Sequence, residues 1–255
     1  PGAGAPLGAA AVAAAPPDGY TLLLIAPGTH AVSAALYPNL AYDPLKSFAS
    51  VGQVAIAPFF VLVNASSPIR SLKDLIDKAR ARPGELSYSS SGNGAGPHLV
   101  SESISSAAGI KTLHVPYNGT APAVLALLSG QVDFAVADMS ALPHVDAGKL
   151  RVLAVTTAKR LALMPQVPTL GEAGVPGLEY TLTVGLVAPA GTPPAVLETL
   201  NASVSRALAH EEVQRKLAAL GYEAAPTTVD GFGAILASDL KKYTAIVRQI
   251  GLKRE

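Results

Sequence analysis

The stretch from Leu86 to His98, LSYSSSGNGAGPH, carries the pattern that decides the fold. Its first five residues, Leu86 to Ser90, predict a short strand, and the run SGNGAG that follows consists of residues that favour turns. Pro97 is a residue type favoured at the first position of a helix. The stretch therefore predicts a strand, a tight loop and a helix in succession.

The same succession recurs on both sides of this stretch. Strand, loop and helix are predicted at 20–26, 27–29 and 30–36, and again at 111–115, 116–119 and 120–129. Gly130 provides a stop signal for the last of these helices, and a further strand is predicted at 132–137. Strands that alternate with helices indicate parallel sheets covered on both faces. The predicted fold class is α/β.

Composition excludes several classes of protein. The 255 residues carry 19 basic and 18 acidic side chains, a net charge of +1, and aromatic residues are 5% with no Trp. This is neither the charge nor the stacking surface of a nucleic-acid-binding protein. Hydrophobic residues are 49%, enough for a sizeable core, but no apolar run reaches the about 18 residues of a membrane span. With no Cys, disulfides, thiolate metal sites and cysteine nucleophiles are excluded, and the redox compartment stays undecided.

Two further predicted strands suggest a division into two domains. The strand 59–63 leads through NASSPIRS into the middle of the chain, and the strand 183–188 leads through PAGTPP into a closing region of amphipathic helices at 195–209, 211–220 and 230–250. Two such crossings predict a bilobal, hinged protein with a cleft between its lobes. We expect one discontinuous domain, 1–62 plus 185–255, and a second domain, 63–184.

The motifs of common enzymes are missing from the sequence. It holds no GxSxG, Walker A, GxGxxG or HExxH pattern, and its five histidines show no metal-ligand spacing. Each histidine is expected to be a hydrogen-bonded turn or helix-start residue. A catalytic set could be drawn from Ser90, His98 and Asp138, although a chain this rich in Ser supplies such triples by chance. We predict no catalytic residue, metal or cofactor.

Three predicted loops are small, neutral and rich in hydroxyl groups: 27–30, 89–98 and 117–120. Small residues let a ligand approach the backbone, and the N–H groups at a helix start favour an anion. In open α/β sheets such loops line one crevice. They predict a cleft that holds a small anion without a formal positive charge, unless Gly and Ser merely make tight turns there. Asp138 could receive an ammonium group, hold water or cap the next turn, and the Tyr117 hydroxyl could face the cleft or pack.

Five segments together resemble a known family. They are PDGYTLLL, PGTHAV with ALYPNLAYDPLKSF, LSYSSSGNGAGPHL, HVPYNGTAPAVLALLSGQVDFAVAD and AGKLRVLAVTTAKRLALMPQVPTLGEAGVPG. In this order they resemble the substrate-binding proteins of tripartite tricarboxylate transporters, also called Bug-type solute receptors. The resemblance runs from Pro1 to about Leu252 and is most specific between Leu150 and Gly177.

The resemblance implies a bilobal type II periplasmic binding protein fold, with two α/β domains joined by two crossover strands. Such a receptor captures a di- or tricarboxylate or an acidic amino acid and delivers it to integral membrane transporter subunits. It implies a periplasmic, monomeric protein that is not an enzyme and does not itself span the membrane. By position, the resemblance assigns ligand binding to nine residues: Gly28, Thr29, Ser90, Ser91, Gly92, Asn93, Tyr117, Thr120 and Asp138.

The sequence departs from the family in two places. Asn118 stands where the family usually has Lys or Arg, which removes a cation near the expected cleft. The family also begins with a signal peptide, a first strand, a Gly-containing loop and a first helix that would precede Pro1. We therefore expect an N-terminally truncated chain whose first domain lacks that strand and helix. The alternatives are an α/β hydrolase-like enzyme that uses Ser90 and the ligand-sensing lobe of a regulatory system.

Overall fold

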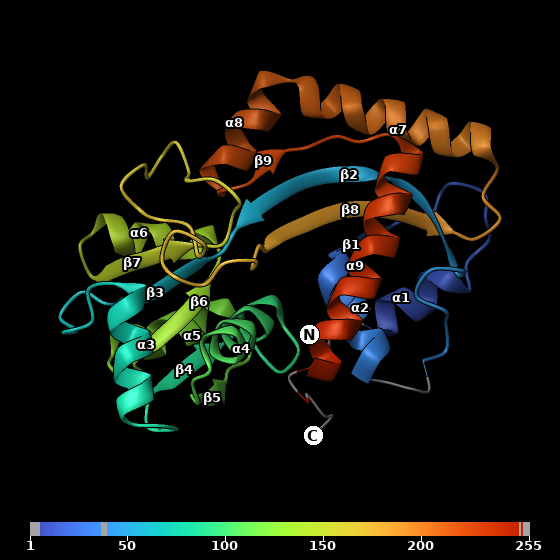
Figure 1. Cartoon of the computed structure of the whole chain (residues 1–255). Helices are drawn as coiled ribbons and strands as arrows, with labels where there is room; N and C mark the ends of the chain where they lie inside the picture. The colour runs from blue at the N-terminus through green and yellow to red at the C-terminus, as the bar shows by residue number, and fades with distance from the viewer. Residues whose placement is uncertain (1–5, 37–39, 250, 252–255) are drawn as a thin grey trace. The chain divides into compact units, whose positions relative to one another are not determined.

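The computed structural model describes residues 6–36, 40–249 and 251 (Figure 1). The chain divides into two compact units, residues 1–56 with 182–255 and residues 57–181. The boundaries expected from the sequence, after residues 62 and 184, lie a few residues further along. Two strands, β2 (Phe48–Pro58) and β8 (Thr181–Pro189), contain the points of division. Both passages of the chain from one unit to the other are therefore made in extended backbone.

The first unit is built on a four-stranded sheet with the order β1-β8-β2-β9. Besides β2 and β8 its elements are α1 (Pro6–Ala13), β1 (Leu23–Ile25), α2 (Pro27–Leu36), α7 (Pro194–Ala209), α8 (Glu211–Ala219), β9 (Glu223–Ala224) and α9 (Val229–Gln249). β1 pairs antiparallel with β8, and β9 pairs antiparallel with β2. The three closing helices predicted from amphipathic patterns are confirmed as α7, α8 and α9.

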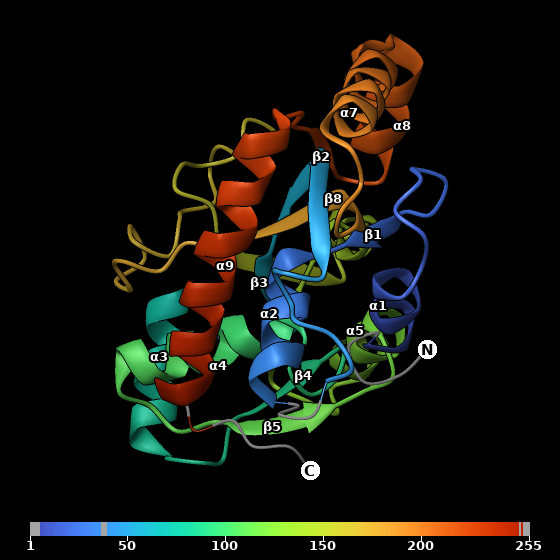
Figure 2. The ribbon, with the colours of Figure 1, turned by 90° about the vertical axis from the view of Figure 1, so that its right-hand side faces the viewer.

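Both faces of this sheet carry apolar side chains, as the period-two alternation of a strand requires. Val187 of β8 packs with Ile25 and with Phe232 of α9 on one face. Its neighbour Ala188 packs with Val51 and with Leu197 of α7 on the other. Figure 2 shows α9 and α7 on either side of β2 and β8. These strands are rich in apolar residues because helices cover both faces of their sheet.

The predicted loop at 27–29 is wrong, because α2 begins at Pro27. Proline at a first helical position has its φ angle already set and loses no hydrogen bond there. The His30 N–H donates to the Ala26 carbonyl at 3.0 Å, which closes the first helical turn. Gly28 and Thr29 therefore lie inside a helix. α2 packs along α9, and the two helices are neighbours in Figures 1 and 2.

The second unit is built on a five-stranded sheet with the order β5-β4-β6-β3-β7. Its elements are β3 (Phe60–Asn64), α3 (Leu72–Ala81), β4 (Ser87–Ser90), α4 (Gly96–Ala108), β5 (Leu113–Pro116), α5 (Thr120–Leu128), β6 (Phe134–Ala137), a 3₁₀ turn η1 (Met139–Ala141), α6 (Leu142–Asp146) and β7 (Leu150–Val155). The strand–loop–helix successions predicted to begin at Leu86 and at Lys111 are confirmed.

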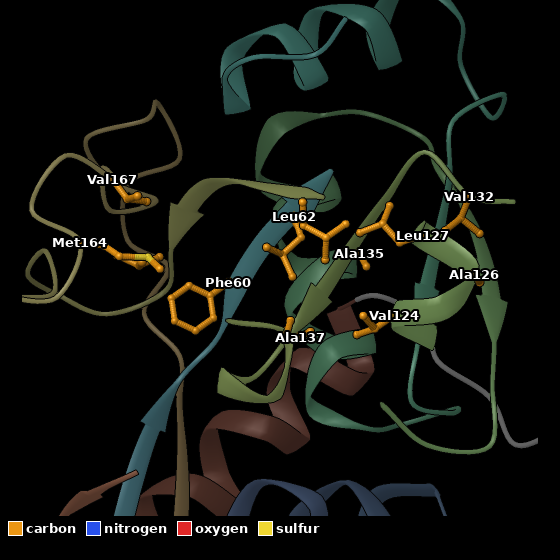
Figure 3. Close-up of a cluster of buried hydrophobic side chains, with 13 residues drawn as sticks. Phe60, Leu62, Val124, Ala126, Leu127, Val132, Ala135, Ala137, Met164 and Val167 are labelled. Atoms are coloured by element: carbon orange, nitrogen blue, oxygen red, sulfur yellow. The ribbon is translucent and has the colours of Figure 1, made fainter. Parts of the chain in front are cut away.

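The core of this unit lies between the sheet and α5. Alternate residues of the central strands, Phe60 and Leu62 of β3 with Ala135 and Ala137 of β6, face that helix and are all at most 1% exposed. Figure 3 shows these side chains together with Val124, Ala126 and Leu127 of α5, and with Met164 and Val167 of the segment after β7. The opposite face of β4 and β6 is covered by α4. This places α4 and α5 on the two sides of one sheet.

The prediction of parallel sheets is only partly correct. β4, β5 and β6 are parallel, but β3 lies between β6 and β7 and is antiparallel to both. A helical crossover fixes the direction of the strands it joins, whereas β3 follows β2 directly and is not bound by that rule. The expected crossover strand at 59–63 is therefore a central sheet strand, and β2, which the sequence analysis did not predict, makes the crossing.

No helix within the described ranges is both long and apolar enough to cross a membrane.

Candidate functional site

The strands β4, β5 and β6 are parallel, so the chain segments after them leave the sheet at one edge. Two of these segments are joined through their backbones. The Tyr117 N–H donates to the Ser90 carbonyl at 3.0 Å, and the Gly119 N–H donates to the Ser91 carbonyl at 3.2 Å. The structure therefore brings the predicted loop residues that follow β4 and β5 together.

Glycine is required at one position of the first loop. Gly92 has a φ of 133°, which side-chain-bearing residues rarely adopt, so the backbone conformation and not a lack of space requires glycine there. We name residues 90–95 the Ser90 loop. Asn93, at its tip, is exposed, while Ser91 is half-buried. The loop presents backbone and small polar groups and no charged side chain.

Two helices begin at this edge, α4 after the Ser90 loop and α5 after Gly119. Their N-cap residues are Ala95 and Gly119, and neither makes a side-chain cap hydrogen bond. A helix start carries about half a positive charge on its N–H groups. Thr120, the first residue of α5, is half-buried there. The two helix starts thus offer N–H donors at this edge without a cation, as the neutral sequence of these loops predicts.

Beneath the Ser90 loop lies a cluster of polar side chains, in which Ser90 and His98 are buried and His114 is half-buried. Ser90 is fully buried, and its Oγ lies 2.6 Å from Nε2 of His114, 3.2 Å from the Gly92 N and 3.1 Å from the Gly92 O. The imidazole of His98, only 4% exposed, stacks on that of His114 with ring centres 3.8 Å apart and planes 15° apart. Nδ1 of His98 accepts the Gly94 N–H at 3.1 Å. Two histidines thus lie directly under the loop.

The cluster continues deeper into the unit. Tyr88 stacks on His114 with ring centres 4.9 Å apart, and its hydroxyl donates to Oε1 of Glu102 in α4. Burial raises the pKa of Tyr88, and the bond to the Glu102 carboxylate raises it further. Burial, and to a smaller extent the neighbouring His114, lowers the pKa of His98 to about 3. At neutral pH the His98 ring is therefore uncharged.

Asp138 follows β6 at the same edge and acts as a cap. Its Oδ1 accepts the Ser140 N–H at 3.0 Å and the Ser140 hydroxyl at 2.6 Å. Tyr117 directs its hydroxyl to Oε1 of Gln131 at 3.3 Å and packs its ring on the core cluster of the unit. Of the alternatives left open by the sequence, the structure has the capping role for Asp138 and the packed position for Tyr117. Direct ligand contacts of either residue stay predictions.

The two predicted site residues of the first unit lie in α2. A Cβ at Gly28 would come within 2.9 Å of the Tyr243 ring of α9, so this glycine allows the two helices to approach. The side chain of Thr29 lies outside the described part of the chain. Nearby, Nε2 of His30 bonds to the Pro44 carbonyl at 2.9 Å, and burial lowers the pKa of this histidine. A ligand role for Gly28 and Thr29 stays a prediction.

The catalytic set suggested by the sequence is not assembled. Ser90 is bonded to His114 rather than to His98, it is fully buried, and Asp138 is occupied by Ser140. Among the described residues no group of three or more His, Cys, Asp or Glu side chains is placed to hold a metal ion.

No site role was predicted for His114, and His98 was considered only as a helix-start residue or as a member of the catalytic set with Ser90 and Asp138. A signal for both was available in the strand period. Tyr88 and Ser90 lie on the same face of β4, and the parallel register places His114 opposite Tyr88 on that face. The helix that follows the Ser90 loop covers this face and brings His98 with it. The missing step was the pairing of β4 with β5.

Two α/β units joined by two strands, with neutral loops and uncapped helix starts at a sheet edge, are typical of a bilobal solute-binding receptor. Comparison with known proteins confirms this class. The model of the family described as tripartite tricarboxylate transporter family receptor matches residues 1–252. The chain belongs to this family, whose members are solute-binding receptors and not enzymes.

Individual relatives agree with the family assignment. BugT of Bordetella pertussis is 33% identical over 254 residues, covering 99% of this chain and 78% of that protein. A structure titled R. palustris Rpa4515 with adipate is 34% identical with a TM-score of 0.90, covering 99% of this chain and 85% of the other. MatC from Rhodopseudomonas palustris with bound malate is 32% identical with a TM-score of 0.84, covering 96% and 85%. The expected bilobal α/β fold is thereby confirmed.

Proposed function

We propose that the protein is a periplasmic receptor that binds a small carboxylate and delivers it to the membrane subunits of a tripartite tricarboxylate-type transporter. The observation that carries the proposal is the edge formed by the Ser90 loop and the 117–120 loop. At this edge two helices begin without a side-chain cap, and the two loops contain several glycines and no charged residue.

Such an edge suits a carboxylate better than a neutral solute. Backbone N–H groups at helix starts donate to anionic oxygens, and the hydroxyls of Ser91 and Thr120 add donors that can also bridge through water. Ligand contacts by the backbone N–H groups of Ser91 and Asn93 follow from this chemistry, whereas the Gly92 N–H between them donates to Oγ of Ser90. That two relatives were solved with adipate and with malate supports a dicarboxylate as the ligand class.

Thermal unfolding with and without ligand tests the proposal. Adipate, malate, citrate and glutamate are compared with adipamide and malamide, which keep the shape of two of the acids and lack their charge. A ligand at 100 times its Kd adds about 2.7 kcal/mol to the free energy of unfolding, which raises Tm by about 5–10 °C in a protein of this size. We expect a rise with at least one acid and no rise with adipamide or malamide.

Equal shifts with an acid and its amide would contradict carboxylate recognition, and no shift with any acid would contradict the receptor function for this ligand class. Delivery is tested in vesicles that hold the transporter subunits. Uptake of the labelled acid should require added receptor, and it should be lost when the receptor is omitted.

A further inference from the structure

The Ser90 hydroxyl has three partners and a limited bonding capacity. A hydroxyl carries one proton to donate and two lone pairs to accept with. The Gly92 N–H occupies one lone pair, and the Gly92 carbonyl can only accept the proton. All three contacts are satisfied together when Nε2 of His114 carries a proton and donates it to the remaining lone pair. The two contacts between Ser90 and Gly92 therefore require a proton on Nε2 of His114.

The bond from Gly94 fixes His98 in the same way. A ring nitrogen that accepts an N–H must be unprotonated, so Nδ1 of His98 is bare and the ring proton lies on Nε2. Protonation of Nδ1 would set two N–H groups against each other at 3.1 Å. The groups that face this ring are His114, stacked on it, and Tyr88, whose hydroxyl is bonded to Glu102. The contact from Gly94 therefore requires a neutral His98.

From this geometry we infer that His98 and His114 are positioning residues of the Ser90 loop, which fix its backbone at Gly94 and Gly92 from the buried side and so prepare it for a carboxylate. The inference rests on the proposed function. In this role both histidines act on binding through the loop, at Gly94 and, by way of Ser90, at Gly92.

A loop with glycines at 92 and 94 has unusual conformational freedom, and its ordering on binding would weaken affinity. Both glycines have positive φ, 133° and 75°, and each is tied to the cluster below by its own N–H group. The tip residue Asn93 stays exposed between them. The histidines thus supply order without placing a side chain on the exposed side of the loop.

Two substitutions of His98 separate the acceptor from the bulk of the ring. In His98→Asn, the side-chain oxygen lies where Nδ1 lies in histidine, so an acceptor for Gly94 is kept. His98→Leu has a similar volume and no acceptor. Both variants lose the stack on His114, which makes them matched controls for each other.

The first readout needs no ligand. We expect the Gly94 amide to exchange with deuterium about 3–10 times faster in His98→Leu than in His98→Asn, the range that one net hydrogen bond implies. In the unsubstituted chain, ¹⁵N chemical shifts should show His98 neutral and protonated at Nε2. Equal Gly94 exchange in the two variants, or a proton on Nδ1 of His98, would overturn the inference.

The second readout is the Kd for adipate and for malate by calorimetry. We expect His98→Leu to bind these acids about 3–10 times more weakly than His98→Asn does, without a difference in Tm between the two variants. Equal Kd values together with unequal Gly94 exchange would show that the loop is held but that holding it does not serve binding, which also overturns the inference. If the unsubstituted chain binds none of adipate, malate, citrate and glutamate, the proposed function is contradicted, and Gly94 exchange then decides the loop-holding role alone.

Discussion

The buried, neutral His98 makes the stability of this protein depend on pH in a way that one substitution should remove. In the folded chain the pKa of His98 is lowered to about 3, chiefly by burial, from an ordinary value of 6.5. Between these values the unfolded chain binds a proton at this side chain and the folded chain does not. The free energy of unfolding therefore falls as the pH is lowered from 6.5 toward 3.

The magnitude follows from the difference between the two pKa values. pH 4.5 lies about two units below the ordinary pKa of histidine. Protonation of His98 in the unfolded chain therefore lowers the free energy of unfolding by about 1.36 kcal/mol per unit, or about 2.7 kcal/mol. At pH 7 the corresponding contribution is about 0.2 kcal/mol. His98 alone should thus lower the free energy of unfolding by about 2.5 kcal/mol between pH 7 and pH 4.5.

Urea unfolding at the two pH values, followed by circular dichroism, measures this contribution. In His98→Asn the side chain does not titrate, so the loss of stability between pH 7 and pH 4.5 should be about 2.5 kcal/mol smaller than in the unsubstituted chain. Carboxylates such as that of Asp43, whose pKa is lowered by backbone hydrogen bonds, contribute equally to both proteins and cancel in the comparison.

His210 provides the control, since its side chain is exposed. His210→Asn should lose as much stability between the two pH values as the unsubstituted chain. If His98→Asn does so as well, the His98 ring is not held neutral in the fold and the reasoning fails.

Three further predictions concern single positions. In Gly185→Ala the new Cβ would lie 2.1 Å from the fully buried Phe232 ring, so we expect the free energy of unfolding in urea to fall by about 3 kcal/mol, with partial recovery in Gly185→Ala/Phe232→Leu. Asn118→Lys adds a cation beside the Ser90 loop, and calorimetry should show tighter, more salt-sensitive binding of malate. His114→Gln keeps a donor for Ser90 and should preserve the exchange protection of the Gly92 amide, which His114→Leu should reduce about 3–10-fold.

Each of these has an opposing outcome. An unchanged urea midpoint in Gly185→Ala would mean that the Phe232 ring can move aside. Salt-independent binding in Asn118→Lys would place the ligand beyond the reach of that residue. Equal Gly92 exchange in the two His114 variants would show that Ser90 holds the loop unaided.

Much of the second unit was predictable from local pattern. The residues of β4 and β5 form short runs between turn-forming segments, and Pro97 and Gly130 mark a helix start and a helix end. These signals act over a few residues, so they depend little on the rest of the chain. The Ser90 loop was found for the same reason, since its glycines and hydroxyls are adjacent in the sequence.

Elements whose stability comes from distant partners were predicted less well. β2 has glycine and glutamine within it and reveals no strict alternation, because its burial is set by α7, α9 and the neighbouring strands. The antiparallel direction of β3 depends on where it enters the second sheet. No local pattern carries that information.

By itself, the sequence determined an α/β chain of two units, the neutral loops after β4 and β5, and the family to which the chain belongs. Only the tertiary structure decided what lies beneath those loops. His98 and His114 are separated by 16 residues, and they stack because β4 pairs with β5 in one register while α4 covers that face. Strand pairing and helix packing are long-range contacts, and only they bring these two histidines together beneath the Ser90 loop.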